Sequence, residues 1–273
     1  MQPLKAKIPS SGEMLARVGL GTYKTFDVIG NPQVERDLKQ ILTAFVASGG
    51  SLIDSSPMYG LAEEVVGTLS HETNTNQKLF VATKVWTTGR AQGEREIQSS
   101  IQKLRRTKLD LLQIHNLIDW RTHLKTLRAL KDRGSIRYIG ITHYTPHAFG
   151  EMEKILKSEQ IDFIQIPYSI VERTAEDRLI PIAATLGVAV IANEPFAKGG
   201  IFKKAHGRKL PAWAADMGIH SWSQYFLKFI LANPAIQFVI PATRNPAHLA
   251  DNMLAATGKL PDLNQRAKML SEF

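Results

Sequence analysis

Four polar residues that can carry out proton transfer stand at or just after the ends of apolar runs. Asp54, Lys84 and His115 each end such a run, and Tyr59 follows Asp54 after a short loop. Buried strands ordinarily end in turn formers, so a titratable side chain at such a position faces whatever pocket the strands share. The pattern therefore predicts one site that gathers these four side chains.

Placed together, the four side chains suit protonation of an oxygen that is gaining negative charge. A carboxylate beside an ammonium keeps the lysine charged and in place, and a cation beside a phenol is expected to lower the tyrosine pKa from about 10. A histidine that donates a ring N–H can orient and polarise a carbonyl oxygen. Each residue alone has an ordinary structural explanation, as a helix cap, loop aromatic, strand-end lysine or core histidine. Their coincidence favours a site.

Short β-rich runs alternate along the chain with longer segments of helical period. This alternation predicts parallel strands joined by helical crossovers. The helical period is clearest over Gln33–Ala47, Glu94–Leu104 and Thr122–Leu130. The expected strands are Arg17–Gly21, Ser51–Asp54, Leu79–Val85, Leu109–His115, Tyr138–Thr142, Phe163–Pro167, Ala189–Ala192 and Gln237–Pro241.

Eight strand–helix units close most economically into a (β/α)8 barrel, with a doubly wound open sheet as the alternative. Neither of the glycine-rich nucleotide motifs of open sheets follows a strand here, and Gly19-Leu-Gly21 fits a close backbone approach better. The predicted fold class is α/β, one TIM barrel domain over residues 1–273. Two additions are expected, a long loop after the seventh strand (Ala197–Met217) and a C-terminal helix (Asp262–Phe273). The barrel mouth would bring the four polar residues together.

Composition bounds the possible partners. The net charge of +9 makes an anionic partner plausible, but the basic residues are dispersed, so we expect no nucleic acid partner. No apolar stretch reaches the ~20 residues of a membrane helix, and the absence of cysteine excludes disulfides and thiolate metal sites. We expect a cytoplasmic monomer or weak oligomer, the alternative location being an exported protein with its signal peptide removed.

The four residues and their spacing resemble the aldo/keto reductase family. The family pattern is met by Leu52-Ile-Asp54-Ser-Ser-Pro-Met-Tyr59-Gly, Ala82-Thr-Lys84 and Gln113-Ile-His115, and the likeness continues to Asn252. The resemblance implies a barrel that binds NADPH (and NADP+) across its mouth and reduces a small-molecule aldehyde or ketone. By that resemblance Tyr59 is the general acid, Lys84 tunes it, Asp54 supports Lys84 and His115 positions the carbonyl.

The resemblance also implies cofactor contacts, with two departures from the family pattern. Thr142-His143 stands where the family has Ser-Asn for the nicotinamide carboxamide, with Gln165 as third partner, and Asn193 replaces the stacking aromatic. Phe196 is a possible substitute for that aromatic. The implied cofactor residues are Gly21, Thr22, Thr142, His143, Gln165, Asn193, Pro195, Lys198, Gly199, Thr243, Arg244, His248 and Asn252.

Arg244 precedes Asn245-Pro246 at a predicted helix start, which suits the 2′-phosphate and favours NADPH over NADH. An apolar substrate pocket is expected from Tyr23, Met58, Trp86 and Trp120, which follow strands at the mouth. Two alternatives stay open. One is a non-catalytic NADP(H)-binding sensor or scaffold on the same barrel, and the other is a metal-dependent hydrolase, for which no metal ligand cluster is expected.

Overall fold

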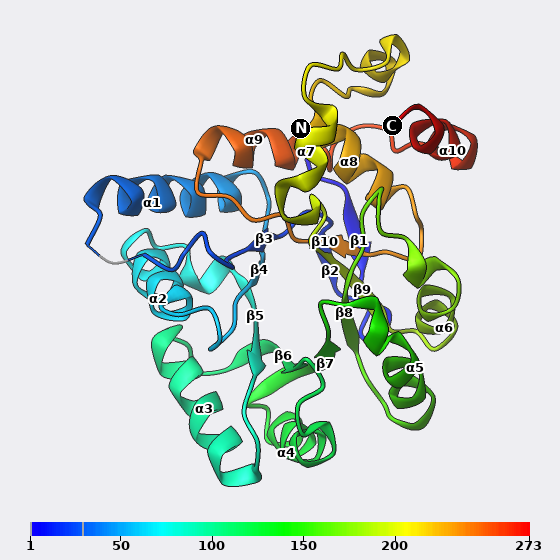
Figure 1. Ribbon diagram of the computed structural model, residues 1–273. Helices are drawn as coiled ribbons and strands as arrows, with labels where there is room; N and C mark the ends of the chain where they lie inside the picture. Colours follow the sequence, from blue (N-terminus) through cyan, green and yellow to red (C-terminus); the bar gives the residue numbers. More distant parts are fainter. Residues whose placement is uncertain (1, 29) are drawn as a thin grey trace.

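Eight parallel strands lie at the centre of the computed structural model, which describes residues 2–28 and 30–273. They are neighbours in chain order, and the sheet curls so that its first strand returns to its last (Figure 1). The Gly19 N–H donates to the Val239 carbonyl at 2.8 Å and the Gly21 N–H to the Pro241 carbonyl at 3.0 Å. The strands are β3 Leu20–Gly21, β4 Leu52–Asp54, β5 Phe80–Val85, β6 Leu109–His115, β7 Ile136–Thr142, β8 Phe163–Pro167, β9 Ala189–Asn193 and β10 Phe238–Val239.

The prediction of a (β/α)8 barrel is confirmed, and the open doubly wound sheet is excluded by the closing hydrogen bonds. Glycine is required where the first strand lies against its neighbours on both sides. A Cβ atom on Gly19 would lie 2.7 Å from the Leu52 carbonyl oxygen, and one on Gly21 would lie 3.0 Å from the Ile240 carbonyl oxygen. The predicted close backbone approach at Gly19-Leu-Gly21 is therefore what the structure contains.

Helices surround the strands (Figure 1). Several begin at side-chain caps, among them Asn31 before α1, Asn245 before α9 and Asp262, which forms a capping box with Gln265 before α10. The α-helices are α1 Pro32–Ala47, α2 Ala62–Glu72, α3 Arg90–Lys103, α4 Trp120–Asp132, α5 Phe149–Ser158, α6 Leu179–Thr185, α7 Gly200–Ala205, α8 Trp222–Leu231, α9 Pro246–Leu254 and α10 Leu263–Glu272. The 3-10 turns are η1 Asn76–Lys78, η2 Pro146–Ala148, η3 Thr174–Glu176, η4 Ala197–Gly199 and η5 Ala212–Met217.

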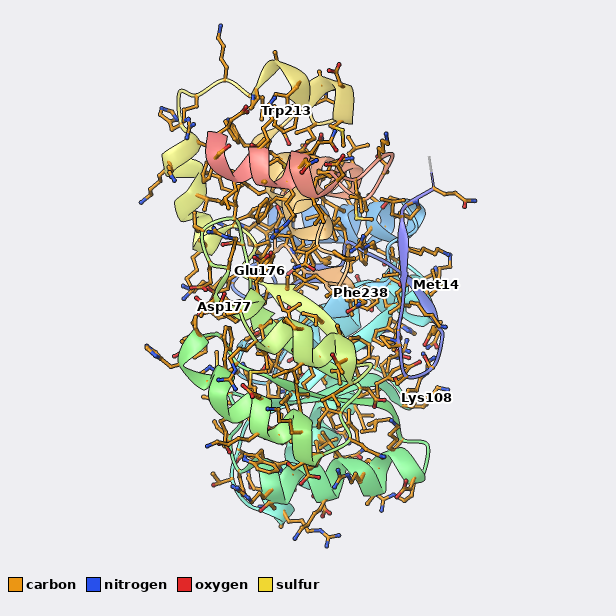
Figure 2. The ribbon with its side chains drawn as sticks, turned by 90° about the vertical axis from the view of Figure 1, so that its right-hand side faces the viewer. Met14, Lys108, Glu176, Asp177, Trp213 and Phe238 are labelled. Atoms are coloured by element: carbon orange, nitrogen blue, oxygen red, sulfur yellow. The ribbon has the colours of Figure 1, made fainter. Side chains whose placement is uncertain are left out.

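The two predicted additions are present, with one correction. The C-terminal helix is α10, whereas the long connection after β9 is largely helical, containing η4, α7 and η5. Trp213 of η5 lies far out on the molecule, next to α10 (Figure 2), and its indole N–H donates to Glu272 of α10 at 2.8 Å. Among the described residues, no helix is long and apolar enough to cross a membrane.

An antiparallel hairpin that the sequence did not predict closes the N-terminal end of the barrel. It consists of β1 Lys5–Lys7 and β2 Met14–Ala16. Ile8 and Leu15 of this hairpin are buried and belong to the apolar cluster inside the barrel. In Figure 2, Met14 lies at the end opposite to the β8–α6 connection, which carries the labelled Glu176. Water is thus kept from one end of the barrel, and the C-terminal strand ends form the other.

Alternation along the strands creates two apolar clusters. Side chains such as Ile53, Val81 and Ile114 pack outward against the helices. The intervening side chains fill the barrel interior, namely Leu52, Phe80, Ala82, Leu111, Tyr138, Phe163, Ala189, Ile191, Phe238 and Ile240. Since a strand repeats every two residues, the positions two beyond these also face inward. These positions include Asp54, Lys84, Gln113, Gln165 and Asn193, and Thr142 lies four beyond Tyr138 on the same face; together they form the polar upper layer of the barrel.

Candidate active site

A buried ion pair joins β4 to β5 at the barrel mouth. Asp54 and Lys84 are only 2 % and 1 % exposed, and the Lys84 Nζ donates to both carboxylate oxygens of Asp54 at 2.8 and 2.9 Å. Nζ also donates to the Ser55 carbonyl at 2.7 Å, so all three ammonium protons have acceptors. Burial is the largest single influence and would lower the pKa of Lys84, but the charges and hydrogen bonds of Asp54 and Tyr59 together outweigh it, so the pKa is raised. Lys84 is therefore held as a fixed cation.

Tyr59 lies over this cation. The Lys84 Nζ is 4.9 Å from the centroid of the Tyr59 ring. The expectation of a lowered tyrosine pKa is wrong: burial raises the pKa of Tyr59, and the opposing charge of Lys84 only reduces that rise. The physical reason is the cost of transferring a phenolate into a poorly solvated site, to which Asp54 adds repulsion. At neutral pH Tyr59 carries its proton, the form needed in a proton donor.

His115 is held in one orientation by Ser56. The Ser56 Oγ lies 3.0 Å from the His115 Nδ1 and accepts the Met58 N–H at 3.2 Å. Burial, reinforced by the charge of Lys84, lowers the pKa of His115 to about 3, so the ring is neutral. A Ser56 hydroxyl that donates to Nδ1 places the imidazole proton on Nε2. His115 thereby presents a neutral N–H donor.

Aromatic side chains continue the wall on either side of Tyr59 and His115. The Tyr59 and His115 ring centroids are 5.9 Å apart, Tyr23 lies 4.9 Å from Tyr59, and Trp86 lies 6.3 Å from His115. Tyr23 and Trp86 are 43 % and 40 % exposed, so part of each ring faces solvent. Met58 lies in the loop beside Tyr59 and is partly buried. Three of the four predicted pocket residues thus lie around the tetrad of Asp54, Tyr59, Lys84 and His115.

Trp120, the fourth predicted pocket residue, has different surroundings. It is the first residue of α4 and packs against the apolar layer between sheet and helices. The Arg121 guanidinium lies 4.3 Å from its ring centroid. Its described contacts are therefore with the outer core and with Arg121, and none of the aromatic pairs at the mouth includes it.

A second set of polar groups follows from the pairing of β6, β7 and β8. Thr142 is paired with His115 on one side and with Gln165 on the other, and both Thr142 and Gln165 are buried. The next residue, His143, donates its backbone N–H to the Gln165 carbonyl at 3.2 Å. The His143 Nδ1 accepts the Thr145 N–H at 3.1 Å, and burial lowers the pKa of His143. Its neutral ring therefore also carries its proton on Nε2.

Asn193 ends β9 and offers an acceptor without a partner. Its Oδ1 is buried and accepts no hydrogen bond from the described residues. Phe196 does not replace the missing aromatic, because its ring packs 4.9 Å from that of Phe202 in the outer apolar layer. Pro195, the residue before Phe196, is buried. Within the described part of the chain, Phe196, Phe202 and Trp213 of the connection after β9 all pack against the outer apolar cluster.

The loop after β9 approaches the loop after β7. Lys198 pairs with Glu194 at 3.3 Å, and its Nζ lies 5.7 Å from the centroid of the Tyr144 ring. That ring is stacked on His143, with centroids 5.4 Å apart. Gly199 is exposed at φ +86°, with open space where a Cβ would lie. A cation–aromatic contact thus connects the two loops next to the mouth.

The other predicted cofactor residues occupy two places. Gly21 and Thr22 flank the tetrad: Gly21 pairs with Asp54, and the Thr22 hydroxyl donates to the Asp54 carbonyl at 2.9 Å. The remaining residues lie just before and within α9: Thr243 and Asn252 are buried, and Arg244 and His248 are exposed. An open groove of about 760 Å³ runs there between α1 and α9, lined by Asn31, Val34, Asp37, Gln40, Arg244, Asn245, Pro246 and Ala247.

Three residues that the sequence did not single out support this arrangement. Ser56 orients His115, Thr145 orients His143, and Gln113 donates to Asp54 at 3.2 Å. Gln113 carries a visible signal, since an amide two residues before His115 breaks an apolar strand at an inward position. Ser56 and Thr145 carry none, because loop hydroxyls are common and their roles depend on the folded geometry.

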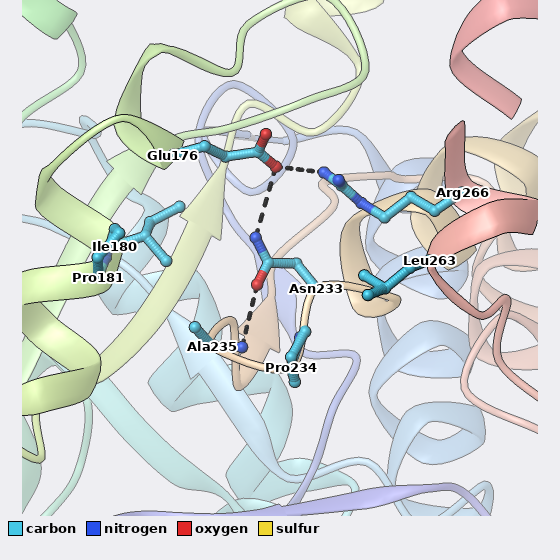
Figure 3. Close-up of a pocket in the computed structure, with 8 residues that line it drawn as sticks. All are labelled: Glu176, Ile180, Pro181, Asn233, Pro234, Ala235, Leu263 and Arg266. Carbon is cyan, nitrogen blue, oxygen red and sulfur yellow. Dashed lines mark hydrogen bonds and ion pairs between the residues drawn. The ribbon is translucent and has the colours of Figure 1, made fainter. Parts of the chain in front are cut away.

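A smaller cavity of about 210 Å³ lies outside the barrel (Figure 3). Glu176, Asn233 and Arg266 line it, and Glu176 pairs with both of the others. Its charged groups are thus bound to one another. Across the described residues, no group of three His, Asp or Glu side chains is arranged to hold a metal ion, so the metal-hydrolase alternative gains no ligand set.

The family model for the aldo/keto reductase family matches residues 17–265. The chain therefore belongs to this family. Aldo-keto reductase YhdN of Bacillus subtilis is 27 % identical over 70 % of this chain, and the match spans only 62 % of YhdN itself. Protein tas of Escherichia coli is 29 % identical over 80 % of this chain and 75 % of its own length. A Klebsiella pneumoniae aldo/keto reductase, solved with NADP and acetate, has a TM-score of 0.83 and 21 % identity, covering 99 % and 95 % of the two chains.

Proposed function

We propose that this protein is an oxidoreductase that reduces the carbonyl group of an aldehyde or ketone with NADPH, and that residues 1–273 act as one catalytic domain. Family membership supports this, as do the similar folds of two Klebsiella pneumoniae reductases solved with NADP and with NADPH. The observation that carries the proposal is the position of Tyr59 and His115, whose rings lie together beside the buried Lys84–Asp54 pair at one mouth.

The residues of the tetrad have separate roles in this reaction. When bound, the nicotinamide supplies a hydride to the carbonyl carbon. His115 donates its Nε2–H to the carbonyl oxygen and fixes its position. Tyr59 gives its proton to that oxygen as negative charge develops, and the Lys84 cation stabilises the phenolate that remains. Asp54 keeps Lys84 charged and aimed at the phenol.

The polar groups of this chain fit a nicotinamide carboxamide. That group offers one acceptor oxygen and two donor hydrogens. His143 provides an Nε2–H donor, while the buried Oδ1 of Asn193 is an acceptor that lacks a partner among the described residues. Gln165 adds an amide from the neighbouring strand. These residues, together with Thr142, are proposed to hold the carboxamide, and Tyr23, Met58 and Trp86 to line the substrate pocket.

The groove at the start of α9 is proposed to take the adenosine 2′-phosphate. Arg244 is exposed at the groove and forms no ion pair within the described part of the chain, so its guanidinium is available. The N-terminus of α9 adds the favourable end of a helix dipole. Asp37 lines the opposite side and would repel a phosphate placed against it, which directs the phosphate toward Arg244. Thr243, His248 and Asn252 are the proposed neighbours of the adenosine, and Lys198 and Gly199 those of the pyrophosphate.

Replacement of Tyr59 tests the proposal. We expect the wild type to bind NADPH and reduce members of an aldehyde and ketone panel, and Tyr59→Phe to keep NADPH affinity while losing about 10²- to 10⁴-fold in turnover. Binding is measured by quenching of tryptophan fluorescence and turnover by NADPH absorbance.

A matched control is Tyr168→Phe, which also removes a hydroxyl that faces a carboxylate and a cation, but outside the barrel. It should leave turnover unchanged. Undiminished turnover in Tyr59→Phe would refute the assigned role. Wild-type protein that binds NADPH without turnover on any substrate would favour the sensor alternative, and stoichiometric zinc or manganese in elemental analysis would favour the hydrolase.

A further inference from the structure

Gln113 is a buried polar residue of the barrel interior that has no part in the proposed reaction. It lies on β6, two residues above Leu111 and two below His115, and is 0 % exposed. Its strand neighbours at this level are Lys84 on β5 and Gly140 on β7. The residue therefore lies beneath the mouth, between the proton-donating side of the site and the strands of the carboxamide side.

The amide of Gln113 connects these two sides. Its Nε2 donates to the Asp54 Oδ1 at 3.2 Å and lies 3.4 Å from the Gln165 Oε1. The orientation is determined by chemistry, because the Asp54 carboxylate is paired with Lys84 and accepts hydrogen bonds only. A flipped amide would place one oxygen against another. The nitrogen of Gln113 is thus shared between Asp54 and Gln165.

Fold stability alone does not explain a glutamine at this position. The Gln113 Oε1 is buried without a hydrogen-bond partner among the described residues. A buried acceptor of this kind is unfavourable, and an apolar residue of similar volume would remove it. The side chain is also confined, since a Cβ on Gly140 would lie 2.9 Å from the Gln113 Cγ. A costly polar group is thus held in one position next to two functional residues.

We propose that Gln113 is a positioning residue that couples the proposed proton donor, Tyr59, to the residues proposed to hold the nicotinamide carboxamide, among them Gln165. This rests on the proposed function. By donating to Asp54, Gln113 offsets part of the carboxylate charge that would otherwise act on Lys84 and Tyr59. By donating to the Gln165 Oε1, it turns the Gln165 amide so that its NH2 group is free to donate to the carboxamide oxygen of the cofactor. One side chain thereby acts on both halves of the site.

The test is Gln113→Met, which keeps the volume and removes the donor. We expect NADPH affinity to fall about two- to tenfold, as for loss of one hydrogen bond. The alkaline limb of the turnover–pH profile should move to higher pH, because an unshielded Asp54 raises the pKa of Tyr59. Leu111→Met is the matched control, being one layer lower on the same face of β6, and it should change neither property.

A double variant separates positioning from a structural role. If Gln113 acts on the cofactor through Gln165, then Gln113→Met added to Gln165→Met should weaken NADPH binding no further than Gln165→Met alone. Additive losses would overturn the coupling. If Gln113→Met does not fold, Gln113→Asn is measured instead, since its amide stays polar but is too short to reach both partners.

The outcomes distinguish the two proposals. Unchanged affinity and pH profile in a folded Gln113 variant, with an active wild type, would overturn the role of Gln113 and leave the proposed function standing. A wild type that does not bind NADPH would overturn the proposed function, and this inference with it.

Discussion

Two clusters in this protein contain the same three kinds of group, a carboxylate, a cation and a tyrosine, yet only one lies in the barrel mouth. The mouth has Asp54, Lys84 and Tyr59, while the outer cluster has Glu176, Arg266 and Tyr168. In the outer cluster the tyrosine hydroxyl donates to Glu176 and accepts from Arg266, so its proton is already bound. In the mouth, no carboxylate among the described residues accepts from Tyr59, whose proton remains available.

The two clusters show that the same kinds of side chain can be held in different electrostatic surroundings. Burial raises the pKa of both tyrosines, and at Tyr168 the hydrogen bond to Glu176 raises it further. At Tyr59 the chief opposing influence is the charge of Lys84. In the proposed function, a cation that faces a phenol without a carboxylate between them suits that phenol to act as an acid. A carboxylate bonded directly to the phenol makes a structural link that joins the β8–α6 connection to α10.

The largest difference between the clusters is expected on removal of the cation. Lys84→Met leaves Asp54 buried without its charged partner, which should cost about 3–5 kcal/mol of unfolding free energy. Turnover should fall about 10²- to 10⁴-fold. Arg266→Met should destabilise the protein less, because Glu176 is 28 % exposed, and should not alter turnover. Urea unfolding and NADPH absorbance measure the two effects. Loss of turnover in a folded Arg266→Met protein would contradict the proposal that only the mouth cluster takes part in the reaction.

A second expected difference is the loss of stability on acidification, to which the buried His115 in the mouth contributes. The folded-state pKa of His115 is lowered to about 3, below the unfolded value near ~6.5. Between these pH values the unfolded chain binds a proton that the folded protein does not, so His115 should remove ~1.4 kcal/mol of stability per pH unit as pH falls from about 6.5. Above that range it contributes nothing.

The measurement is urea unfolding of the wild type and of His115→Gln at pH 7, 6 and 5. The variant should lose less stability on acidification, and the difference isolates His115 from other titrating groups. The Nε2–H form should persist in NMR spectra over the same range. A His115 that titrates near pH 6.5, or equal losses in both proteins, would show that the mouth is less desolvated than its geometry indicates.

Much of the barrel could be predicted from the sequence because its signals are local. Alternation of β-rich and helical segments located all eight strands, with β6 and β8 correct at both ends. The β1–β2 hairpin was missed because its strands are only three residues long and carry exposed side chains such as Lys5, Lys7 and Met14. The sequence therefore contains no apolar run that indicates it.

The residues of the site could be predicted from the sequence, but the directions of their pKa shifts could not. Strand alternation places Asp54, Lys84 and His115 on one wall. The direction of the Tyr59 pKa depends on how burial compares with the charge of Lys84, and a sequence gives the charges without the burial. The orientation of Phe196 could not be predicted either, because its packing against Phe202 depends on how the connection after β9 folds.

The smallest predicted effect concerns two asparagines. Asn233 of the outer cluster uses both ends of its amide, donating to Glu176 at 3.4 Å and accepting the Ala235 N–H at 3.0 Å. The Asn193 Oδ1 in the mouth has no hydrogen-bond partner among the residues that the structure describes. Asn193→Tyr supplies the aromatic that the family has there. If the nicotinamide lies beside β9, a stacked ring should tighten NADPH binding about two- to tenfold, corresponding to ~0.5–1.5 kcal/mol.

Fluorescence quenching measures this change, with Phe196→Leu as the control, because Phe196 packs in the outer layer and should not affect NADPH affinity. A weaker affinity in Asn193→Tyr would mean that the Asn193 amide itself binds the cofactor more strongly than a stacked ring does. The Asn193 Oδ1 would then be a contact to the cofactor. The two asparagines would differ in that Asn193 binds a ligand, whereas Asn233 is bonded within the fold.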